Sequence, residues 1–298
     1  MAHALIAGWG YLGSYAGSLL ARAGHRVTGM RRSRPDVSLP AGISLIQADL
    51  LSDRTLPLPD DITWVIYAVG ADRFTPEAYR AAYVEGLKRL ADALIQKRIP
   101  VERFCFVSST SVYPQQDGEW VDESSPVCGR HFGSATLIEA EQVVSSLPWK
   151  NTAARCGGIY GPGRTRLIDA VRSGQARQVR HPKLILNLIH RDDAAGALIH
   201  LLNHPSPPPI CNLTDLEPID RNELLCWVAA ELGMPAPPWE EETSLSEPAR
   251  GGNRRVSSRL LQLLGFTHRW PTFREGYRAL IQPSHGANAP CTEGTDQE

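Results

Sequence analysis

Short apolar runs alternate with segments of helical periodicity through the first 160 residues. The runs have the length and β-branched content of buried strands. They cover residues 4–7, 27–30, 44–47, 63–68, 103–108 and 152–155. Between them, apolar residues recur at helical spacing over residues 12–23, 75–97 and 135–147. This alternation is typical of α/β proteins, so we predict a doubly wound parallel sheet.

The pattern changes after residue 163, where the predicted helices become shorter and Pro-rich turns appear. We therefore predict a first domain over residues 1–163 and a smaller C-terminal region over residues 164–282. Elements near residues 184–213 are expected to return to the first domain. Residues 283–298 are polar and offer nothing to bury, so we expect them to form a disordered tail.

Composition and charge exclude several classes of function. The 31 Lys and Arg residues balance 32 Asp and Glu residues, so no global field attracts nucleic acid or an acidic membrane. No stretch reaches the roughly 18 apolar residues of a membrane span, and the start of the chain lacks the pattern of a signal peptide. The six cysteines have no paired spacing, so we predict no metal site. We expect a cytoplasmic protein.

Three glycines lie between the first predicted strand and the first predicted helix. Gly8, Gly10 and Gly13 form the sequence G-W-G-Y-L-G. One glycine permits the sharp turn, one lets the backbone approach a diphosphate, and one lets the helix pack against the strand. The diphosphate would rest on the helix N-terminus, where free N–H groups and the dipole favour negative charge. The motif predicts a Rossmann domain that binds NAD(P), with a plain glycine turn as the alternative.

The end of the second predicted strand carries cations where NAD-binding proteins carry a carboxylate. Arg31, Arg32 and Arg34 follow the strand, and the nearest acid is Asp36. Guanidinium groups bind a 2′-phosphate through bidentate, charge-assisted hydrogen bonds. We therefore predict NADP(H) over NAD(H), the alternative being a solvated basic loop.

Asp49 follows the third predicted strand, near the expected position of the adenine ring. Its carboxylate either accepts a hydrogen bond from the adenine amino group or caps the next turn. The residues predicted to contact the cofactor are Gly8, Gly10, Tyr11, Leu12, Gly13, Arg31, Arg32, Asp49, Leu50, Ala68, Val69 and Ser108.

Several further motifs occur in a characteristic order. They are A-D-L at residues 48–50, V-S-S-T-S-V-Y at 107–113, R-C-G-G-I-Y-G-P-G at 155–163, I-H-R-D-D at 189–193, C-N-L at 211–213 and S-S-R-L-L-Q-L-L-G at 257–265. With the glycine turn, they resemble the extended short-chain dehydrogenases/reductases, which include the NAD-dependent epimerases and dehydratases. The closest likeness is to an atypical bacterial branch of that family. The resemblance implies a Rossmann core and a C-terminal region that covers a small-molecule substrate.

The resemblance also implies a catalytic set that this chain lacks in part. The family uses a Ser or Thr, a Tyr, and a Lys four residues after the Tyr that lowers the Tyr pKa. Ser109 occupies the Ser position, but the Tyr position falls at Gly133 and the Lys position at Leu137. Residues 118–147 contain neither a Tyr nor a Lys, and Tyr83 stands where the family has an Asn.

Two classes of function remain. In the first, the protein is an NAD(P)-dependent oxidoreductase or epimerase with a non-standard active site that acts on an unidentified small molecule. Its replacement groups are then Tyr113 or His131, with Tyr160 and His190 as further candidates, although each of these side chains has a structural alternative. In the second, the protein is a non-catalytic NADP(H)-binding regulator or redox sensor. The sequence leaves the oligomeric state open, a homodimer being one option.

Overall fold

A computed structural model describes residues 1–33, 39–180, 183–240 and 252–282. Arg34 and Asp36, which belong to the predicted basic loop, lie outside the described residues, as does the predicted tail at 283–298.

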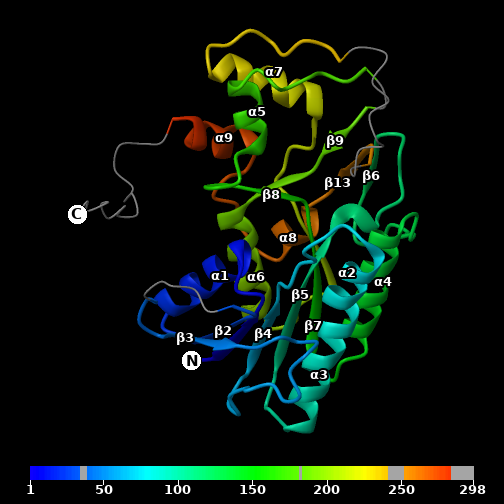
Figure 1. Ribbon diagram of the computed structural model, residues 1–298. Helices are drawn as coiled ribbons and strands as arrows, with labels where there is room; N and C mark the ends of the chain where they lie inside the picture. Colours follow the sequence, from blue (N-terminus) through cyan, green and yellow to red (C-terminus); the bar gives the residue numbers. More distant parts are fainter. Residues whose placement is uncertain (34–38, 181–182, 241–251, 283–298) are drawn as a thin grey trace, which may run out of the picture.

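The core of the molecule is a seven-stranded parallel sheet in the order β11-β7-β5-β4-β1-β2-β3 (Figure 1). The strands span His3–Ala7 (β1), Arg26–Arg31 (β2), Ile43–Gln47 (β3), Trp64–Tyr67 (β4), Arg103–Ser109 (β5), Lys150–Cys156 (β7) and Ile210–Leu213 (β11). The first six match the predicted strands, and the predicted doubly wound fold is confirmed. The seventh joins the sheet from residues 210–213, beside β7.

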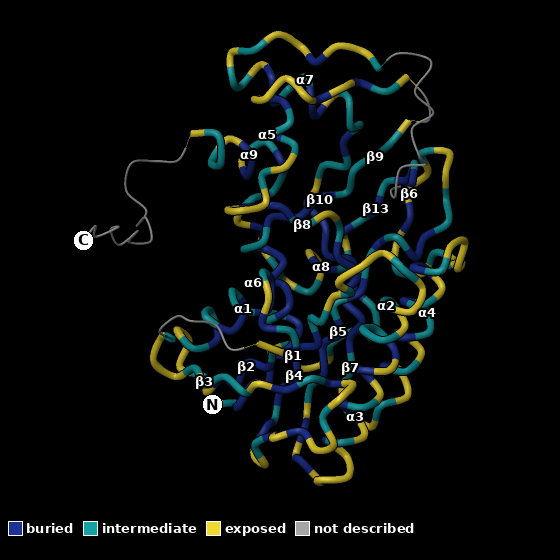
Figure 2. The backbone as a smooth tube through the Cα atoms, viewed as in Figure 1, coloured by how far each residue is buried: buried dark blue, intermediate teal, exposed yellow. Residues whose placement is uncertain are grey.

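Helices cover both faces of this sheet. They include α1 (Tyr11–Arg22), α3 (Gly86–Gln96), α4 (Phe132–Ser145), α6 (Arg191–Asn203) and α8 (Arg259–Leu263). Side chains alternate along a strand, so Leu5 of β1 packs in one apolar cluster with α3 and α4, whereas Ile6 packs in the other cluster with α1, α6 and α8. The sheet is therefore buried from both sides (Figure 2), as the continuous apolar runs predict.

The helix predicted over residues 75–97 is interrupted. Thr75 caps α2 (Pro76–Arg80) by accepting a hydrogen bond from the Ala78 amide at 3.3 Å. A π-helical turn, η1 (Ala81–Glu85), then joins α2 to α3. Such turns often occur at functional sites.

The C-terminal region has its own apolar cluster, built on α5 (Arg166–Arg172), α7 (Arg221–Glu231) and α9 (Phe273–Ile281). Pairs of short strands connect it to the rest of the chain. They are β6 (Glu119–Val121) with β13 (Arg254–Val256), β8 (Gly158–Tyr160) with β10 (Leu188–His190), and β9 (Ile185–Leu186) with β12 (Ile219–Asp220). A short 3₁₀ turn, η2 (Thr110–Val112), follows β5. Within the described ranges, no helix is long and apolar enough to cross a membrane.

Candidate functional site

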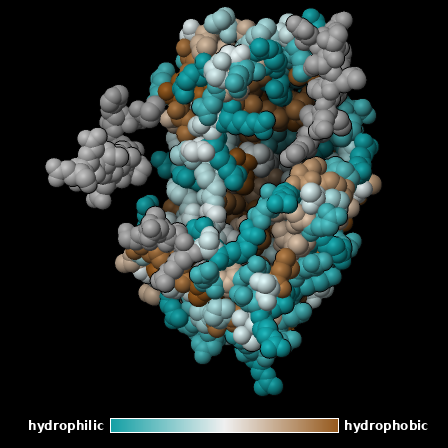
Figure 3. Space-filling model, viewed as in Figure 1, coloured by the Kyte–Doolittle hydropathy of each residue, from teal (hydrophilic) through white to brown (hydrophobic). Residues whose placement is uncertain are grey.

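A cavity of about 410 Å³ lies at the carboxyl ends of four adjacent strands of the sheet. Loops after β1, β2, β3 and β4 form it, together with α2, η1 and the start of α3. The lining residues are Gly8, Trp9, Gly10, Met30, Arg31, Arg32, Ser33, Ala48, Asp49, Leu50, Leu51, Tyr67, Ala68, Val69, Gly70, Ala71, Asp72, Ala78, Ala81, Ala82 and Gly86. Open α/β sheets bind ligands at this edge. Apolar surface is visible in the recess between the sheet and the C-terminal region (Figure 3).

The three glycines of the first turn are required for different reasons. Gly8 has a φ of +96°, and a Cβ there would lie 2.5 Å from the Ala68 carbonyl group. A Cβ on Gly13 would lie 2.2 Å from the Gly8 carbonyl oxygen, because α1 packs closely on the turn. A Cβ on Gly10 would meet no atom of the described chain within 4 Å. Gly10 therefore leaves open space in front of the helix, whereas Gly8 and Gly13 permit the backbone geometry.

The N-terminus of α1 is suited to an anion. Gly10 is its N-cap and supplies no side-chain cap, and the first turn, all of it described, carries no acidic residue. The Arg164 guanidinium lies 4.2 Å from the centroid of the Tyr11 ring, and the Arg191 guanidinium lies 5.3 Å from it. Two cations thus stand beside the helix end that the sequence predicts for a diphosphate.

Eight of the twelve predicted cofactor contacts line the cavity: Gly8, Gly10, Arg31, Arg32, Asp49, Leu50, Ala68 and Val69. The described lining does not include Tyr11, Leu12, Gly13 or Ser108. Leu12 and Gly13 are buried in the first turn of α1. Their expected contribution is through backbone amides.

The two arginines at the end of β2 make different contacts. Arg31 donates a hydrogen bond to the Ser33 hydroxyl at 3.3 Å. Arg32 forms an ion pair with Asp72, which follows β4, with an Nη1–Oδ2 distance of 2.7 Å. The pKa of the Asp72 carboxyl is lowered by this hydrogen bond, and that of Arg32 is raised by it. A basic group therefore does face the cavity where the sequence predicts one.

Asp49 caps a turn and also lines the cavity. One carboxylate oxygen, Oδ1, accepts a hydrogen bond from the Leu51 amide at 2.9 Å, as a turn cap does. The same residue lines the cavity. A single carboxylate thus holds the loop after β3 and faces the space predicted for adenine.

Ser108 and Tyr113 belong to a buried polar network. The Ser108 hydroxyl donates to Glu141 Oε1 at 2.6 Å, and Arg155 donates to both oxygens of Glu141 at 3.0 and 2.7 Å. Arg155 also donates to the Tyr113 hydroxyl, which donates to Asn212 Oδ1 at 2.8 Å. Burial raises the pKa of Tyr113, although Arg155 opposes it.

This network bears on two predicted site residues. Tyr113 is only 1% exposed, so its phenol is a structural hydrogen-bond partner of Arg155 rather than a group open to substrate. The hydroxyl of Ser108 is likewise occupied by Glu141. Ser109 is half-buried, and its hydroxyl accepts a hydrogen bond from the Ser111 amide at 3.1 Å, which caps η2. Its remaining donor capacity is available to a substrate oxygen.

His131 has a structural role at the start of α4. Its Nδ1 accepts hydrogen bonds from the Gly133 and Ser134 amides at 3.1 and 3.3 Å, and Ser134 completes a capping box. The helix therefore begins three residues before the predicted start. The imidazole is exposed, and its cap fixes Nδ1 as an acceptor.

The two positions that replace the family's Tyr and Lys have different surroundings. Leu137 is buried in the apolar cluster between α4 and the sheet. A Cβ on Gly133 would lie 3.1 Å from Cε1 of Tyr79, a residue of α2. The Tyr79 ring also contacts Tyr83 and Phe132, with centroids 5.2 and 5.4 Å away. The rings of Tyr79 and His131, the latter with two atoms 3.2 Å from the same Cβ, thus border the space into which a side chain at position 133 would project.

Tyr160 and His190 meet in the interior between β8 and β10. Their ring centroids are 5.3 Å apart, and His190 caps α6 by accepting a hydrogen bond from the Asp192 amide at 3.2 Å. Burial lowers the pKa of His190. The Tyr160 hydroxyl is buried and has no hydrogen-bond partner in the described part of the chain. Both residues pack in the core, as their structural alternatives predict.

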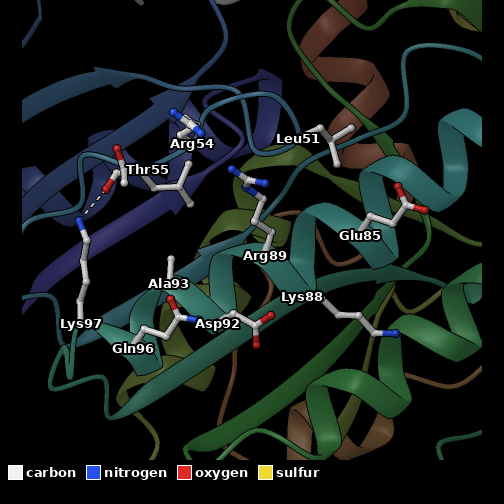
Figure 4. A pocket seen from close by; sticks show the side chains of 11 residues that line it. Leu51, Arg54, Thr55, Glu85, Lys88, Arg89, Asp92, Ala93, Gln96 and Lys97 are labelled. Atoms are coloured by element: carbon white, nitrogen blue, oxygen red, sulfur yellow. Dashed lines mark hydrogen bonds between the residues drawn. The ribbon is translucent and has the colours of Figure 1, made fainter.

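A second cavity of about 630 Å³ lies farther along α3, between that helix and the loop at residues 51–56 (Figure 4). Its lining includes Arg54, Lys88, Arg89 and Lys97, together with Glu85 and Asp92. Lys97 donates a hydrogen bond to the Leu56 carbonyl at 2.6 Å and so closes one end. This cavity contains none of the predicted site residues and shares only Leu51 with the first cavity among the described linings.

Sequence reasoning missed several residues of the first cavity. These are Asp72, Tyr67 and the small residues Ala78, Ala81, Ala82 and Gly86. The sequence pattern that could have indicated them is the run of small residues on one side of the helix predicted over 75–97. Trp9 was also missed. A Cβ on Gly17 or Gly29 would lie within 2.4 Å of its ring, so these glycines make room for Trp9.

Together these features fit a dinucleotide. The open space before Gly10, the uncapped amides of α1 and the nearby guanidinium groups match a diphosphate. Asp49 and the small residues of the helix wall match an adenine ring. Within the described residues, no group of His, Cys, Asp and Glu side chains is arranged to hold a metal ion.

Comparison with known proteins agrees with this geometry. The model of the NAD dependent epimerase/dehydratase family matches residues 4–213. Protein YeeZ of Escherichia coli is 28% identical over 273 residues, which cover 89% of this chain and 95% of YeeZ. A solved structure from Methylobacillus flagellatus, named for the NAD-dependent epimerase/dehydratase class, is 31% identical with a TM-score of 0.74, covering 94% of this chain and 97% of that chain.

A third relative has been solved with ligands. MoeE5 in complex with UDP-glucose and NAD is 25% identical with a TM-score of 0.78, and the match covers 94% of this chain and 97% of that chain. The family match spans more than half of this chain, and the matched residues include the glycine turn and Ala48, Asp49 and Leu50, which line the cavity described above. The chain therefore belongs to the NAD dependent epimerase/dehydratase family, whose proteins bind a nicotinamide dinucleotide.

Proposed function

We propose that this protein is an NADP(H)-dependent oxidoreductase or epimerase that acts on a small molecule. The observation that carries the cofactor preference is the pair of guanidinium groups at the end of β2, both of which line the cavity. The position where NAD-binding relatives carry a carboxylate is occupied by a cation. Residues 1–163 would bind the cofactor, and residues 164–282 would cover the substrate.

Different residues of the chain would bind different parts of the dinucleotide. The amides at the start of α1, with Arg164 and Arg191 beside them, hold the diphosphate. Arg31 and Arg32 hold the 2′-phosphate, and Asp49 accepts from the adenine amino group. When bound, the nicotinamide ring supplies or accepts a hydride.

At the substrate, Ser109 is proposed to donate a hydrogen bond to the reacting oxygen. We propose Tyr79 in place of the absent tyrosine, because its ring fills the space beside Gly133. With a leucine at position 137, no lysine stands four residues after position 133 to lower the pKa of a nearby phenol. Such a phenol keeps its proton near pH 7 and donates it, which favours reduction of a carbonyl over oxidation of an alcohol.

Binding is tested first, by fluorescence titration of wild type, Arg31→Ala and Arg32→Ala with NADPH and with NADH. We expect tighter binding of NADPH by wild type, and loss of that preference in the variants by about tenfold, the effect of one charge-assisted hydrogen bond. An unchanged preference in both variants would contradict the NADP(H) assignment.

Turnover is tested next, by following NADPH absorbance with a panel of carbonyl compounds and nucleotide sugars. Ser109→Ala and Tyr79→Phe are compared with wild type, and Tyr113→Phe serves as the matched control, since that phenol is enclosed in the protein core. We expect the first two variants to lower kcat and the control to retain it. Binding without turnover of any compound would favour a non-catalytic regulator.

A further inference from the structure

An ion pair joins two of the loops that line the first cavity. Arg32 follows β2 and Asp72 follows β4, and both line the cavity. Two contacts join them in parallel, from Nη1 to Oδ2 at 2.7 Å and from Nη2 to Oδ1 at 2.8 Å. This bidentate geometry uses the same face of the guanidinium that binds a phosphate.

The ion pair is also easy to open. The Arg32 and Asp72 side chains are 63% and 59% exposed, and exposed ion pairs contribute little net free energy. A phosphate dianion that enters the cavity can therefore exchange with the carboxylate. Asp72 weakens phosphate binding even after this exchange, because the displaced carboxylate stays near the phosphate and repels it.

Asp72 does not repel a cofactor that lacks the 2′-phosphate. The Asp72 carboxylate is an acceptor that can receive a hydrogen bond from a ribose hydroxyl, as carboxylates do in NAD-binding proteins. Two further charges act on the pair: Asp49, which follows the adjacent strand β3, raises the pKa of Arg32, and Arg73, beside Asp72 in the chain, lowers the pKa of Asp72. Asp72 therefore opposes one cofactor and not the other.

We propose that Asp72 is a cofactor-specificity residue that competes with the 2′-phosphate for Arg32 and so lowers the preference of this protein for NADP(H) over NAD(H). The proposal rests on the proposed function, because it assumes that the cavity binds a dinucleotide. It assigns a role to a loop after β4 that the sequence motifs do not include.

The test is a double-mutant cycle read as dissociation constants, without any substrate. Wild type, Asp72→Asn, Arg32→Ala and the double variant are titrated with NADPH and NADH at low and high salt. Asp72→Ser is a second variant in case the amide forms a new contact. Asp169→Asn, on the exposed surface of α5, controls for the change in net charge.

We expect Asp72→Asn to tighten NADPH binding by about 3- to 10-fold. NADH binding should stay the same or weaken, because the ribose hydroxyl loses a charged acceptor. The gain should shrink at high salt and disappear in the Arg32→Ala background. Unchanged NADPH binding in both Asp72 variants would overturn the proposal, as would an equal gain in the Asp169→Asn control or in the Arg32→Ala background.

The failure of the proposed function would look different. If wild type binds neither dinucleotide, or if Arg31→Ala and Arg32→Ala both leave NADPH binding unchanged, the proposed function is wrong. If Arg32→Ala alone leaves NADPH binding unchanged, Arg32 does not hold the 2′-phosphate and the role of Asp72 is wrong. If wild type binds and Arg32→Ala weakens NADPH binding while the Asp72 variants match wild type, only the role of Asp72 is wrong.

Discussion

Replacing each glycine of the first turn with alanine separates the glycine that faces a ligand from those that permit the fold. Gly10→Ala places a methyl group where no described atom lies within 4 Å, at a φ of −104° that alanine adopts freely. The free energy of unfolding should therefore change by less than about 1 kcal/mol, and the lower entropy of the unfolded chain favours a small gain.

The affinity of Gly10→Ala for NADPH should fall, although its stability should not. The new methyl group occupies the space in front of the α1 amides and separates a phosphate from them. Loss of one hydrogen bond to a charged group costs about 1.5–3 kcal/mol, so NADPH affinity should fall by about 10- to 100-fold.

Gly13→Ala is the matched comparison. Its methyl group would lie 2.2 Å from the Gly8 carbonyl oxygen, and the helix must move to relieve the overlap. Overpacking of this kind typically costs about 1–3 kcal/mol. Urea denaturation followed by circular dichroism measures both free energies, and fluorescence titration measures affinity. If Gly10→Ala binds NADPH like wild type, or loses as much stability as Gly13→Ala, the reasoning is refuted.

Two predictions concern buried charge. Arg155→Ala leaves Glu141 without its buried partner and should lower the free energy of unfolding by about 3–5 kcal/mol. The double variant Arg155→Met with Glu141→Leu should recover most of that loss. If Arg155→Ala is as stable as wild type in urea denaturation, the prediction is contradicted. Burial raises the pKa of Asp215 well above its ordinary value. Wild type should therefore lose stability as pH rises above about 4, whereas Asp215→Asn should not. Parallel Tm profiles of wild type and Asp215→Asn between pH 4 and 9 would count against this prediction.

The sequence predicted what depends on local pattern. The strands of the core and the glycine turn follow from residues close together in the chain, and so does the family. The start of α4 was placed late because histidine is an unusual N-cap, and its ring nitrogen replaces the usual hydroxyl or carboxylate.

Other features depend on contacts between distant residues. The pairing of Arg32 with Asp72 joins residues 40 positions apart, and no periodicity indicates it. The network around Arg155 likewise explains why Tyr113, a reasonable catalytic candidate by motif, lies enclosed in the core. Assigning a role to a tyrosine or histidine requires its hydrogen-bond partners, which only the folded chain supplies.

Tyr79 on α2 and Gly133 on α4 lie so close that a larger side chain at position 133 would press on the Tyr79 ring. A Cβ at position 133 would lie 3.1 Å from the Tyr79 ring and 3.2 Å from the His131 imidazole, so a tyrosine reintroduced there requires these neighbouring rings to shift. The proposed active site is thus not a standard one with side chains simply removed. A return to the standard arrangement would also need a lysine at position 137, where Leu137 is buried in the apolar cluster between α4 and the sheet.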